Sequence, residues 1–382
     1  MKYKKIFIML AAAGLMTACG TDNDVDSSYS AFNIEAPARS AFDNWLLTNF
    51  TQPYNINVIY RYNDSETNNS YNVIPADLDK AKALSVMIKH VWLEAYAEAA
   101  SETFIKTYSP RVYQLIGSAE YSSSNNEMVL GTAEGGLKVT LFRVNAITPA
   151  NPWIDQDSWY PNTAASDPMD LNYWFFKTMH HEFCHILTQT KNYSTEFQTI
   201  SAGDYQTTNW VNVKNEDAPA KGFTSGYGSK EYNEDFAEIF SFYVTHTQAA
   251  FEKLLANAIV ETDVVATDSK GNVVYKKDAE GKLIPQTDAN GNIIYQTDAD
   301  GNIVYTKVTA EDGTESYLPV PAYETEMEKD YTWYNKLVQK FNIVYDYFEK
   351  SWGIDLDKLR EVVLRRSKEV EKGVDTDNMT FK

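Results

Sequence analysis

The stretch HHEFCH, residues 180–185, contains the pattern H-E-x-x-H. On an α-helix, residues i and i+4 lie on one face, so His181 and His185 can hold one metal ion together. Glu182 lies beside them, where a carboxylate can take a proton from a metal-bound water. The pattern is short and also occurs in proteins that bind no metal. A buried polar cluster is therefore the alternative that the context has to exclude.

The residues around the motif predict a buried helix. The segment LNYWFFKTMHHEFCHILTQ (171–189) is apolar on nearly all sides. Asp167 can cap its N-terminus, and Pro168 fits the first helical position. Buried charge is costly unless it is paired or bound to a metal, so the acid and the histidines of this helix need an explanation. We expect Cys184 to pack on the inner side of the helix.

The third ligand has to come from elsewhere in the chain. A catalytic zinc takes three protein ligands and leaves one position for water. Of the five histidines, His180 lies 100° around the helix from His181 and is expected to be a core or rim residue. His90 lies on a distant predicted helix, and His246 ends the segment EYNEDFAEIFSFYVTH (231–246). An acidic third ligand is therefore favoured.

The segment 231–246 predicts a largely apolar helix that carries acids. Glu234 lies in its first turn and is the predicted third ligand, with Glu231 and Asp235 as rivals. A first-turn acid stabilised by the helix dipole is the alternative. Glu238, one turn later on the same face, is predicted to orient a ligand imidazole, unless it is an exposed surface acid. We expect Asn233 to cap the N-terminus of this helix.

Residues 225–240, SGYGSKEYNEDFAEIF, resemble the segment that bears the third zinc ligand in anthrax lethal factor and its metallopeptidase relatives. There a Tyr-Gly precedes an E-x-F-A-E helix by the same interval, and the H-E-x-x-H motif reads H-E-F-G-H, with Cys184 here in place of glycine. The resemblance covers residues 175–245. It implies that Glu234 binds the metal, that Glu238 is the second acid of that helix, and that Tyr227 faces the metal and helps to stabilise the oxyanion.

The N-terminus has the pattern of an export signal. MKYKKIFIMLAAAGLMTACG combines a basic opening with an apolar run that is too short to span a membrane, so residues 1–18 are predicted to be a signal peptide. Met16 to Cys19 resembles a bacterial lipobox, which implies cleavage before Cys19 and a lipid on its thiol. An ordinary signal peptide is the alternative. Residues 19–39 are then the lipidated cysteine and an acidic, serine-rich flexible tether.

The overall layout resembles the substrate import-associated zinc metallohydrolase lipoproteins. The common features are the lipobox, PYNINVIYRY (53–62), the H-E-x-x-H helix and G-I-x-L-D-x-L-R (353–360). The resemblance implies a protein anchored by lipid in the outer membrane of a Gram-negative bacterium. It also implies that a TonB-dependent nutrient importer and glycan-binding lipoproteins are its partners. The acidic residues after Cys19 resemble the surface-export signals of some outer-membrane lipoproteins, which implies that the protein faces the cell surface. The net charge of −19 argues against nucleic-acid binding and against a basic membrane-binding patch.

The remaining periodicity predicts an α+β fold. Helical spacing covers 76–107, and strand-like runs lie at 55–62, 112–116, 126–131 and 137–145. With the active-site helices, this predicts a zincin-like, gluzincin-type metallopeptidase with a mixed, mainly antiparallel sheet. We expect an N-terminal α+β subdomain (40–150), a zinc-binding helical subdomain (151–261), a repeat insert (262–318) and C-terminal helices of the catalytic domain (319–382).

The repeat insert has a ten-residue period. TDSKGNVVYK (267–276) is followed by KDAEGKLIPQ, TDANGNIIYQ and TDADGNIVYT, which ends at residue 306. Each unit joins a D-x-x-G turn to a short β-rich run, which predicts a chain of β-hairpins with glycine in the left-handed position. A calcium loop is disfavoured because the full D-x-D-x-D-G spacing and the distal glutamate are absent.

Together these features predict a zinc metallopeptidase that cleaves peptides or glycoproteins. Zn²⁺ activates the attacking water, Glu182 is the general base, and Tyr227 donates to the oxyanion. LKVTLFRVN (137–145) is predicted to be an edge strand that aligns an extended substrate. One alternative is a non-catalytic lipoprotein that binds a glycan or a partner and keeps the fold. Another is a zinc hydrolase that cuts a different bond.

Overall fold

The structure is a computed structural model. It describes residues 38–63, 72–121, 128–129, 131–134, 137–160, 168–307, 311, 313 and 316–382. The predicted signal peptide, Cys19, all but the last two residues of the tether, and Asp167 lie outside the described residues. Contacts divide the chain after Trp45, and Leu46–Lys382 belong to one unit, which includes most of the predicted N-terminal subdomain. In the described part of the chain, no helix is long and apolar enough to cross a membrane.

The first described elements are helical. They are α2 (Ala41–Leu46), the π-helical η1 (Leu47–Thr51) and α3 (Gln52–Tyr54). Asn55 has a φ of 56°, a left-handed conformation that ends the helical run before strand β1 (Asn57–Ile59). The strand predicted over 55–62 is present as the shorter β1.

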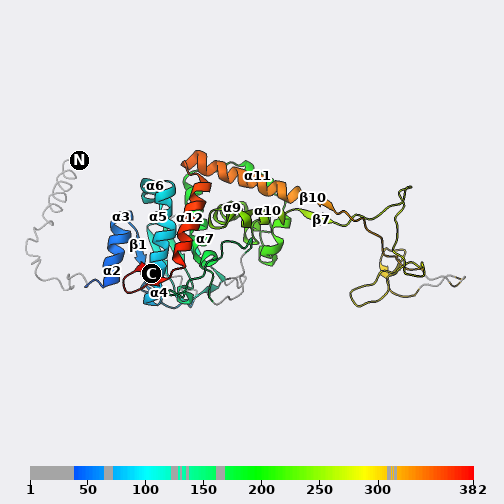
Figure 1. The fold of residues 1–382 in the computed structure, drawn as a ribbon, viewed down its shortest axis with the longest axis horizontal. Coiled ribbons are helices and arrows are strands. Elements are labelled where there is room, and N and C mark those ends of the chain that lie inside the picture. Colours follow the sequence, from blue (N-terminus) through cyan, green and yellow to red (C-terminus); the bar gives the residue numbers. More distant parts are fainter. Residues whose placement is uncertain are drawn as a thin grey trace, which may run out of the picture. The chain divides into compact units, whose positions relative to one another are not determined.

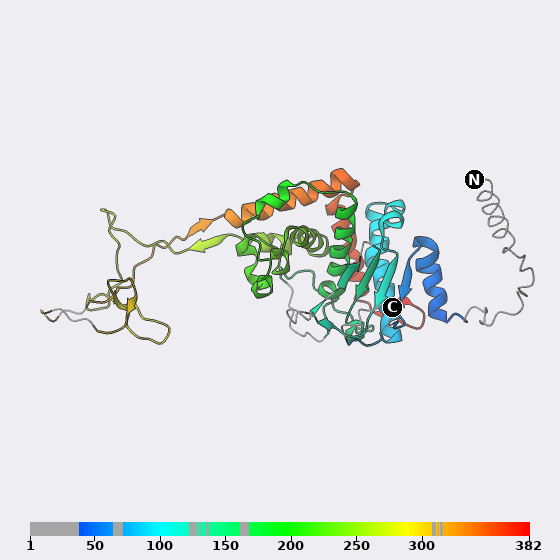
Figure 2. The same cartoon turned by 180° about the vertical axis from the view of Figure 1, so that it is seen from behind.

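One four-stranded sheet supports the site, with the order β1-β2-β6-β5. Its other strands are β2 (Val112–Leu115), β5 (Gly131–Glu134) and β6 (Lys138–Leu141). β2 pairs in parallel with both β1 and β6, and only β5 is antiparallel to its neighbour. The prediction of a mainly antiparallel sheet is thus wrong for this sheet, although small antiparallel pairs such as β3 (Glu120–Tyr121) with β4 (Met128–Val129) occur elsewhere. Figure 2 shows the teal strands of the sheet with the cyan helices alongside.

The parallel pairing of β1 and β2 follows from the helices between them. The predicted helix 76–107 is present as α4 (Leu78–Ile88), the π-helical η3 (Lys89–Leu93), α5 (Glu94–Ala99) and α6 (Glu102–Tyr108). Such a segment is long enough to return the chain to the starting end of the sheet, as a parallel neighbour requires. β6 has a partner on each side, so its predicted role as an edge strand is also wrong, and β5 is at the edge.

Two helices carry the motif residues. The first is the π-helical η5 (Asn172–Phe176) followed by α7 (Lys177–Thr190), and the second is α9 (Tyr232–Thr245). They pack against each other, and α7 also contacts β5. Asn233 is not the N-cap of α9 because Glu231 occupies that position, and Asn233 instead accepts a hydrogen bond from Tyr193.

An aromatic core fixes the orientation of α7. Phe183 is fully buried, with its ring centroid 5.0 Å from that of Trp92 and 5.1 Å from that of Tyr96. Trp92 also contacts Tyr113 of β2 edge to face. Phe183 and Cys184 therefore anchor one side of α7 in the core.

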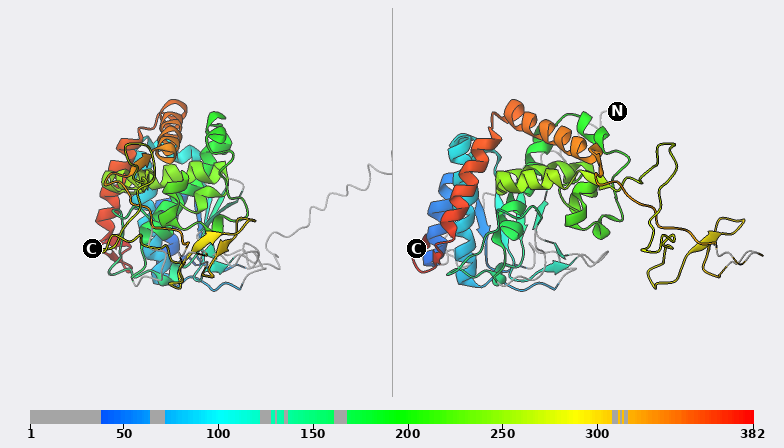
Figure 3. Two further views of the ribbon diagram at one scale, coloured as in Figure 1. Left: turned by 90° about the vertical axis from the view of Figure 1, so that its right-hand side faces the viewer. Right: turned by 45° about the vertical axis from the view of Figure 1, so that its right-hand side comes forward.

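The C-terminal helices pack on α9 and support it. They are α11 (Thr332–Tyr347), which continues as the π-helical η10 (Phe348–Trp352), and α12 (Leu356–Val370). In Figure 3, right, α9 lies beneath the orange α11 and beside the red α12. The other helical segments are α8 (Glu196–Ile200), α10 (Gln248–Ala256), η4 (Val144–Ala146), η6 (Trp210–Asn212), η7 (Asn215–Asp217), η8 (Pro219–Lys221) and η9 (Tyr227–Ser229). The chain ends with the antiparallel strands β11 (Val374–Asp375) and β12 (Thr380–Phe381).

The repeat segment connects to the rest of the chain through a two-stranded ribbon. β7 (Val260–Thr262) pairs antiparallel with β10 (Glu328–Asp330), as Figure 1 shows. Between them, the turn glycines of the four repeats have φ values between 81° and 85°. The short strands β8 (Tyr295–Thr297) and β9 (Ile303–Val304) are one antiparallel pair of the segment. Residues 265, 275, 285 and 295, which are ten residues apart, form single bridges with residues 323, 321, 319 and 317 of the segment that leads back to β10. Each ten-residue step along the repeats therefore corresponds to a two-residue step along that segment.

Candidate metal centre

Three side chains from two helices converge on one point. His181 and His185 extend from one face of α7, and Glu234 extends from the first turn of α9. Nε2 of His181 lies 3.1 Å from Nε2 of His185 and 3.2 Å from Oε2 of Glu234. The His185 Nε2 to Glu234 Oε2 distance is 3.1 Å. Among the described residues, these three form the group of histidine, cysteine and acidic side chains that could hold a metal ion.

The spacing of these three atoms fits zinc. Zn–N and Zn–O bonds of about 2.0–2.2 Å in tetrahedral geometry place ligand atoms roughly 3.3 Å apart. The three observed separations are close to that value. Two nitrogens and one carboxylate oxygen also match the donors of a catalytic zinc site, which keeps a fourth position open. The residues present therefore fit a zinc ion.

Glu238 contacts the far side of the His181 ring. Its Oε1 lies 2.9 Å from Nδ1 of His181, whereas Nε2 of the same ring faces Glu234. A carboxylate at Nδ1 fixes the tautomer that leaves Nε2 available to a metal. The structure thus brings Glu238 to the position predicted for a residue that orients a ligand imidazole.

Two partners of Glu238 were missed by the sequence reasoning. Nζ of Lys177 lies 2.5 Å from Oε1 of Glu238, and the Ser225 hydroxyl donates to Oε2 at 2.5 Å. Burial alone would raise the pKa of Glu238. The Lys177 charge and the hydrogen bond with His181 outweigh burial and hold that pKa well below its usual range. The clue in the sequence was a lysine in an otherwise apolar helix, one turn before the first motif histidine.

Tyr227 reaches the other oxygen of the Glu234 carboxylate. Its hydroxyl donates to Oε1 of Glu234 at 2.7 Å, and its ring centroid lies 5.7 Å from that of His181. Trp210 packs edge to face on the Tyr227 ring, with 5.0 Å between centroids. Burial and the neighbouring carboxylate charge raise the pKa of Tyr227, so its hydroxyl remains a proton donor. The ammonium of Lys230, which was not predicted at the site, also donates to Oε1, at 2.8 Å.

Glu182 is half-buried, and it lies close enough for its charge to act on both His181 and Tyr227. Within the described part of the chain, its carboxylate makes no hydrogen bond or ion pair. A carboxylate without a structural partner is free to accept a proton from water, which suits a general base.

His180 and Cys184 lie away from the converging atoms. Both are fully buried, and Nδ1 of His180 is 2.9 Å from the Tyr96 hydroxyl. Burial lowers the pKa of His180 to about 3 and raises the pKa of the Cys184 thiol. His180 is thus a core histidine, and Cys184 packs inward.

The rival acids of the second helix do not join the cluster. Asp235 faces α11, where its Oδ2 lies 2.6 Å from Nζ of Lys340, and both side chains are 0% exposed. The Tyr205 hydroxyl donates to the same carboxylate oxygen at 3.0 Å. Glu231 is the N-cap residue of α9. Asp235 is therefore a packing residue that ties α9 to α11.

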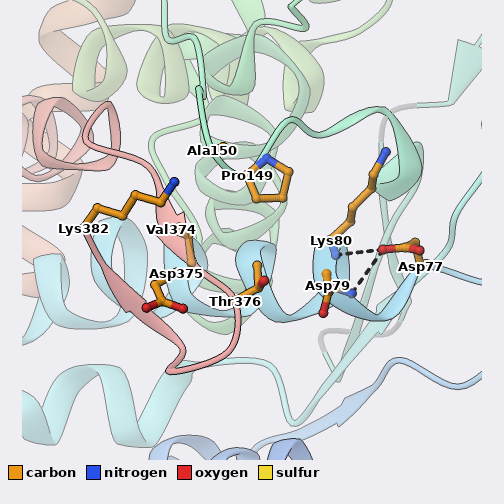
Figure 4. A pocket seen from close by; sticks show the side chains of 9 residues that line it. All are labelled: Asp77, Asp79, Lys80, Pro149, Ala150, Val374, Asp375, Thr376 and Lys382. Carbon is orange, nitrogen blue, oxygen red and sulfur yellow. Dashed lines mark hydrogen bonds between the residues drawn. The ribbon is translucent and has the colours of Figure 1, made fainter.

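The two remaining histidines are also separate from the centre. His90 of η3 lies between Glu94 of α5 and Glu369 of α12, in a charged network that joins these helices. His246 is buried and stacks on Phe242, with 4.1 Å between ring centroids. A pocket of about 450 Å³ lies elsewhere, between the first turn of α4 and the C-terminal segment (Figure 4). None of the site residues named above lines that pocket.

Comparison with known proteins gives two matches. Residues 35–357, most of the chain, match the family described as "Putative zinc-binding metallo-peptidase". A solved chain from Bacteroides caccae, described as a putative zinc-binding metallo-peptidase, is 29% identical with a TM-score of 0.55. The match covers 91% of this chain and 99% of that chain. None of the curated proteins matches this chain.

Proposed function

Because the chain belongs to the family of putative zinc-binding metallopeptidases, we propose that it hydrolyses peptide bonds at the cluster of His181, His185 and Glu234. The observation that carries the proposal is the convergence of three ligand atoms within 3.2 Å of one another. The charge of Glu182 acts on His181, and its carboxylate has no hydrogen bond or ion pair with any other described residue. A zinc ion held by these atoms would polarise the scissile carbonyl and acidify the attacking water.

The side chains of this protein supply the proton transfers. Glu182 takes the proton of the attacking water and passes it to the leaving amine. Tyr227 turns its hydroxyl from Glu234 toward the substrate and donates to the oxyanion as it forms. Glu238 holds His181 in the required tautomer throughout.

Strand β5 is the proposed substrate platform. It is one of the two outer strands of the sheet, the other being β1, and it packs against α7. A Cβ built on Gly131 would lie 2.8 Å from Cγ2 of Thr178, one turn before His181. An extended peptide paired with β5 would therefore pass next to the metal-binding face of α7. This role replaces the one predicted for β6.

We further propose where the protein works. The lipobox-like residues before Cys19 support a lipid anchor in the outer membrane, and the acidic residues after it support a position that faces the cell surface. There the protein would trim peptides or glycoproteins beside a TonB-dependent importer and its glycan-binding lipoproteins. The acidic composition supports attachment through lipid alone.

The test is zinc content and peptide cleavage by the full chain. We expect about one zinc per chain in the wild type and in Glu182→Gln, and none in Glu234→Ala. Cleavage of a mixed peptide library should fall by about 10²-fold or more in Glu182→Gln. Glu361→Gln, a change of an exposed acid on α12, is the matched control and should behave as wild type. A folded wild type that binds zinc without cleaving peptides would refute the peptidase, and one that binds no zinc would refute the metal centre.

A further inference from the structure

Two donors meet on one oxygen of Glu234, while the other oxygen faces the histidines. Oε1 accepts from the Tyr227 hydroxyl at 2.7 Å and from Nζ of Lys230 at 2.8 Å. Oε2 is the atom that lies within 3.2 Å of both imidazole nitrogens. The carboxylate is therefore held from behind by two residues, and one of them is the proposed oxyanion donor.

Lys230 lies within hydrogen-bonding distance of both Glu234 and Tyr227. It follows the 3₁₀ turn that carries Tyr227, and its backbone N–H donates to the Tyr227 carbonyl at 3.0 Å. Its Nζ lies 3.2 Å from the Tyr227 hydroxyl oxygen and 4.9 Å from the centre of that ring. The side chain is 34% exposed, so the ammonium also borders solvent.

The two donors differ in how many protons they offer. A tyrosine hydroxyl has one proton, so Tyr227 cannot donate to Glu234 and to a substrate oxyanion at the same time. A lysine ammonium has three and can hold Glu234 while it donates to the Tyr227 oxygen. A phenol that accepts a hydrogen bond from a cation is a stronger donor to an oxyanion.

We propose that Lys230 is a positioning residue that holds Oε1 of Glu234 and donates to the Tyr227 oxygen, which frees the Tyr227 hydroxyl to donate its hydrogen bond to the substrate oxyanion. The inference rests on the proposed peptidase function and adds a residue to that same site. It predicts that either Lys230 or Tyr227 alone is enough to hold Glu234 when no substrate is bound. It also predicts that, during catalysis, Lys230 affects the substrate only through Tyr227.

The test is a double-mutant cycle of Lys230→Met and Tyr227→Phe in the full chain, with two readouts. The first is the zinc dissociation constant, measured by competition with a chromophoric chelator. Each single variant leaves one donor on Oε1 and should stay within about threefold of wild type, whereas the double variant should weaken by about tenfold or more. If the losses of zinc affinity in the two single variants instead add up to the loss in the double variant, either residue alone does not hold Glu234, and the proposal is overturned.

The second readout is kcat and KM at saturating zinc. Lys230→Met should lower kcat by about tenfold with little change in KM, and should have no further effect in the Tyr227→Phe background. Lys230→Arg keeps the charge and should retain more activity than Lys230→Met. Lys214→Met, which removes an exposed lysine of the same loop region, should leave both readouts unchanged.

The outcomes separate the two proposals. An unchanged kcat in Lys230→Met, or an equal loss in both backgrounds, would overturn the role of Lys230 in a working peptidase. The variants could show the expected pattern of zinc affinities while the wild type cleaves no peptide. That result would overturn the peptidase function and the proposed hydrogen bond from Tyr227 to a substrate. It would leave Lys230 as a residue that holds the metal ligand.

Discussion

Oε1 of Glu238 lies 2.9 Å from Nδ1 of His181, on the opposite edge of the ring from the nitrogen that faces Glu234. Replacing Glu238 with glutamine removes the charge that fixes this tautomer and leaves Lys177 without its carboxylate. We expect zinc affinity to fall by about 10- to 100-fold, as for other carboxylates that orient ligand histidines. Chelator competition measures the change, with Glu361→Gln as control. Unchanged affinity would show that the Glu238 contact does not orient His181.

The buried pair of Asp235 and Lys340 ties α9 to α11 directly behind the proposed ligand Glu234. Both side chains are 0% exposed, and Lys340 also donates to the Gly222 carbonyl at 2.9 Å. Lys340→Met leaves the Asp235 carboxylate buried without its counter-charge, so we expect a loss of about 3–5 kcal/mol in the free energy of unfolding. Urea denaturation measures this loss. Asp235→Asn combined with Lys340→Met should recover part of it, and a milder single variant would contradict the argument.

The buried His246 makes stability depend on pH. Burial lowers its pKa from 6.5 to about 4, so the unfolded chain binds more protons between these values. Stability from this group is complete above pH 6.5 and is lost as the pH falls toward 4, by about 1.4 kcal/mol per pH unit. His246→Asn should remove that part of the slope in urea unfolding between pH 6.5 and 4. Equal slopes in the two proteins would show that His246 is protonated in the folded state.

The repeat segment should be dispensable for the metal centre. Thr262 and Glu328 face each other in the ribbon of β7 and β10, so a two-residue Asn-Gly turn can replace residues 263–327. We expect the shortened chain to bind zinc within about threefold of wild type, because none of the ligands or their supporting residues lies in the deleted segment. Chelator competition tests this expectation. A loss of zinc binding in a folded, shortened protein would give the repeats a structural role at the site.

Helix periodicity and motif spacing were sufficient for much of the site. The i, i+4 spacing places His181 and His185 on one helix face, and the apolar pattern around Glu234 predicts a second buried helix that carries acids. The same local rules predicted that Cys184 packs inward and that His180 is a core residue. They failed at the start of α9, where Glu231 rather than Asn233 occupies the N-cap position. The Asn233 side chain instead accepts a hydrogen bond from Tyr193, a contact from a distant part of the chain that the local sequence does not specify.

Strand pairing was beyond the reach of local pattern. The runs at 55–62, 112–116 and 137–145 each predict a strand, but their alternation is the same in parallel and antiparallel sheets. The pairing is decided by the crossover from α4 to α6, which returns the chain to the starting end of the sheet. The same assembly places β6 in the interior and β5 at the edge, so the proposed substrate strand could not be chosen from hydrophobicity alone.

The sequence by itself determined the chemistry of the site, because helix geometry fixes the relative positions of residues three or four apart. It gave the two histidines, the neighbouring acid and the acids of the second helix. Only the tertiary structure decided which oxygen of Glu234 faces the histidines, and that Lys177, Lys230 and Lys340 pair with Glu238, Glu234 and Asp235. Side-chain contacts such as these depend on how α7, α9 and α11 pack. That packing is set by the whole core, which no local stretch of sequence specifies.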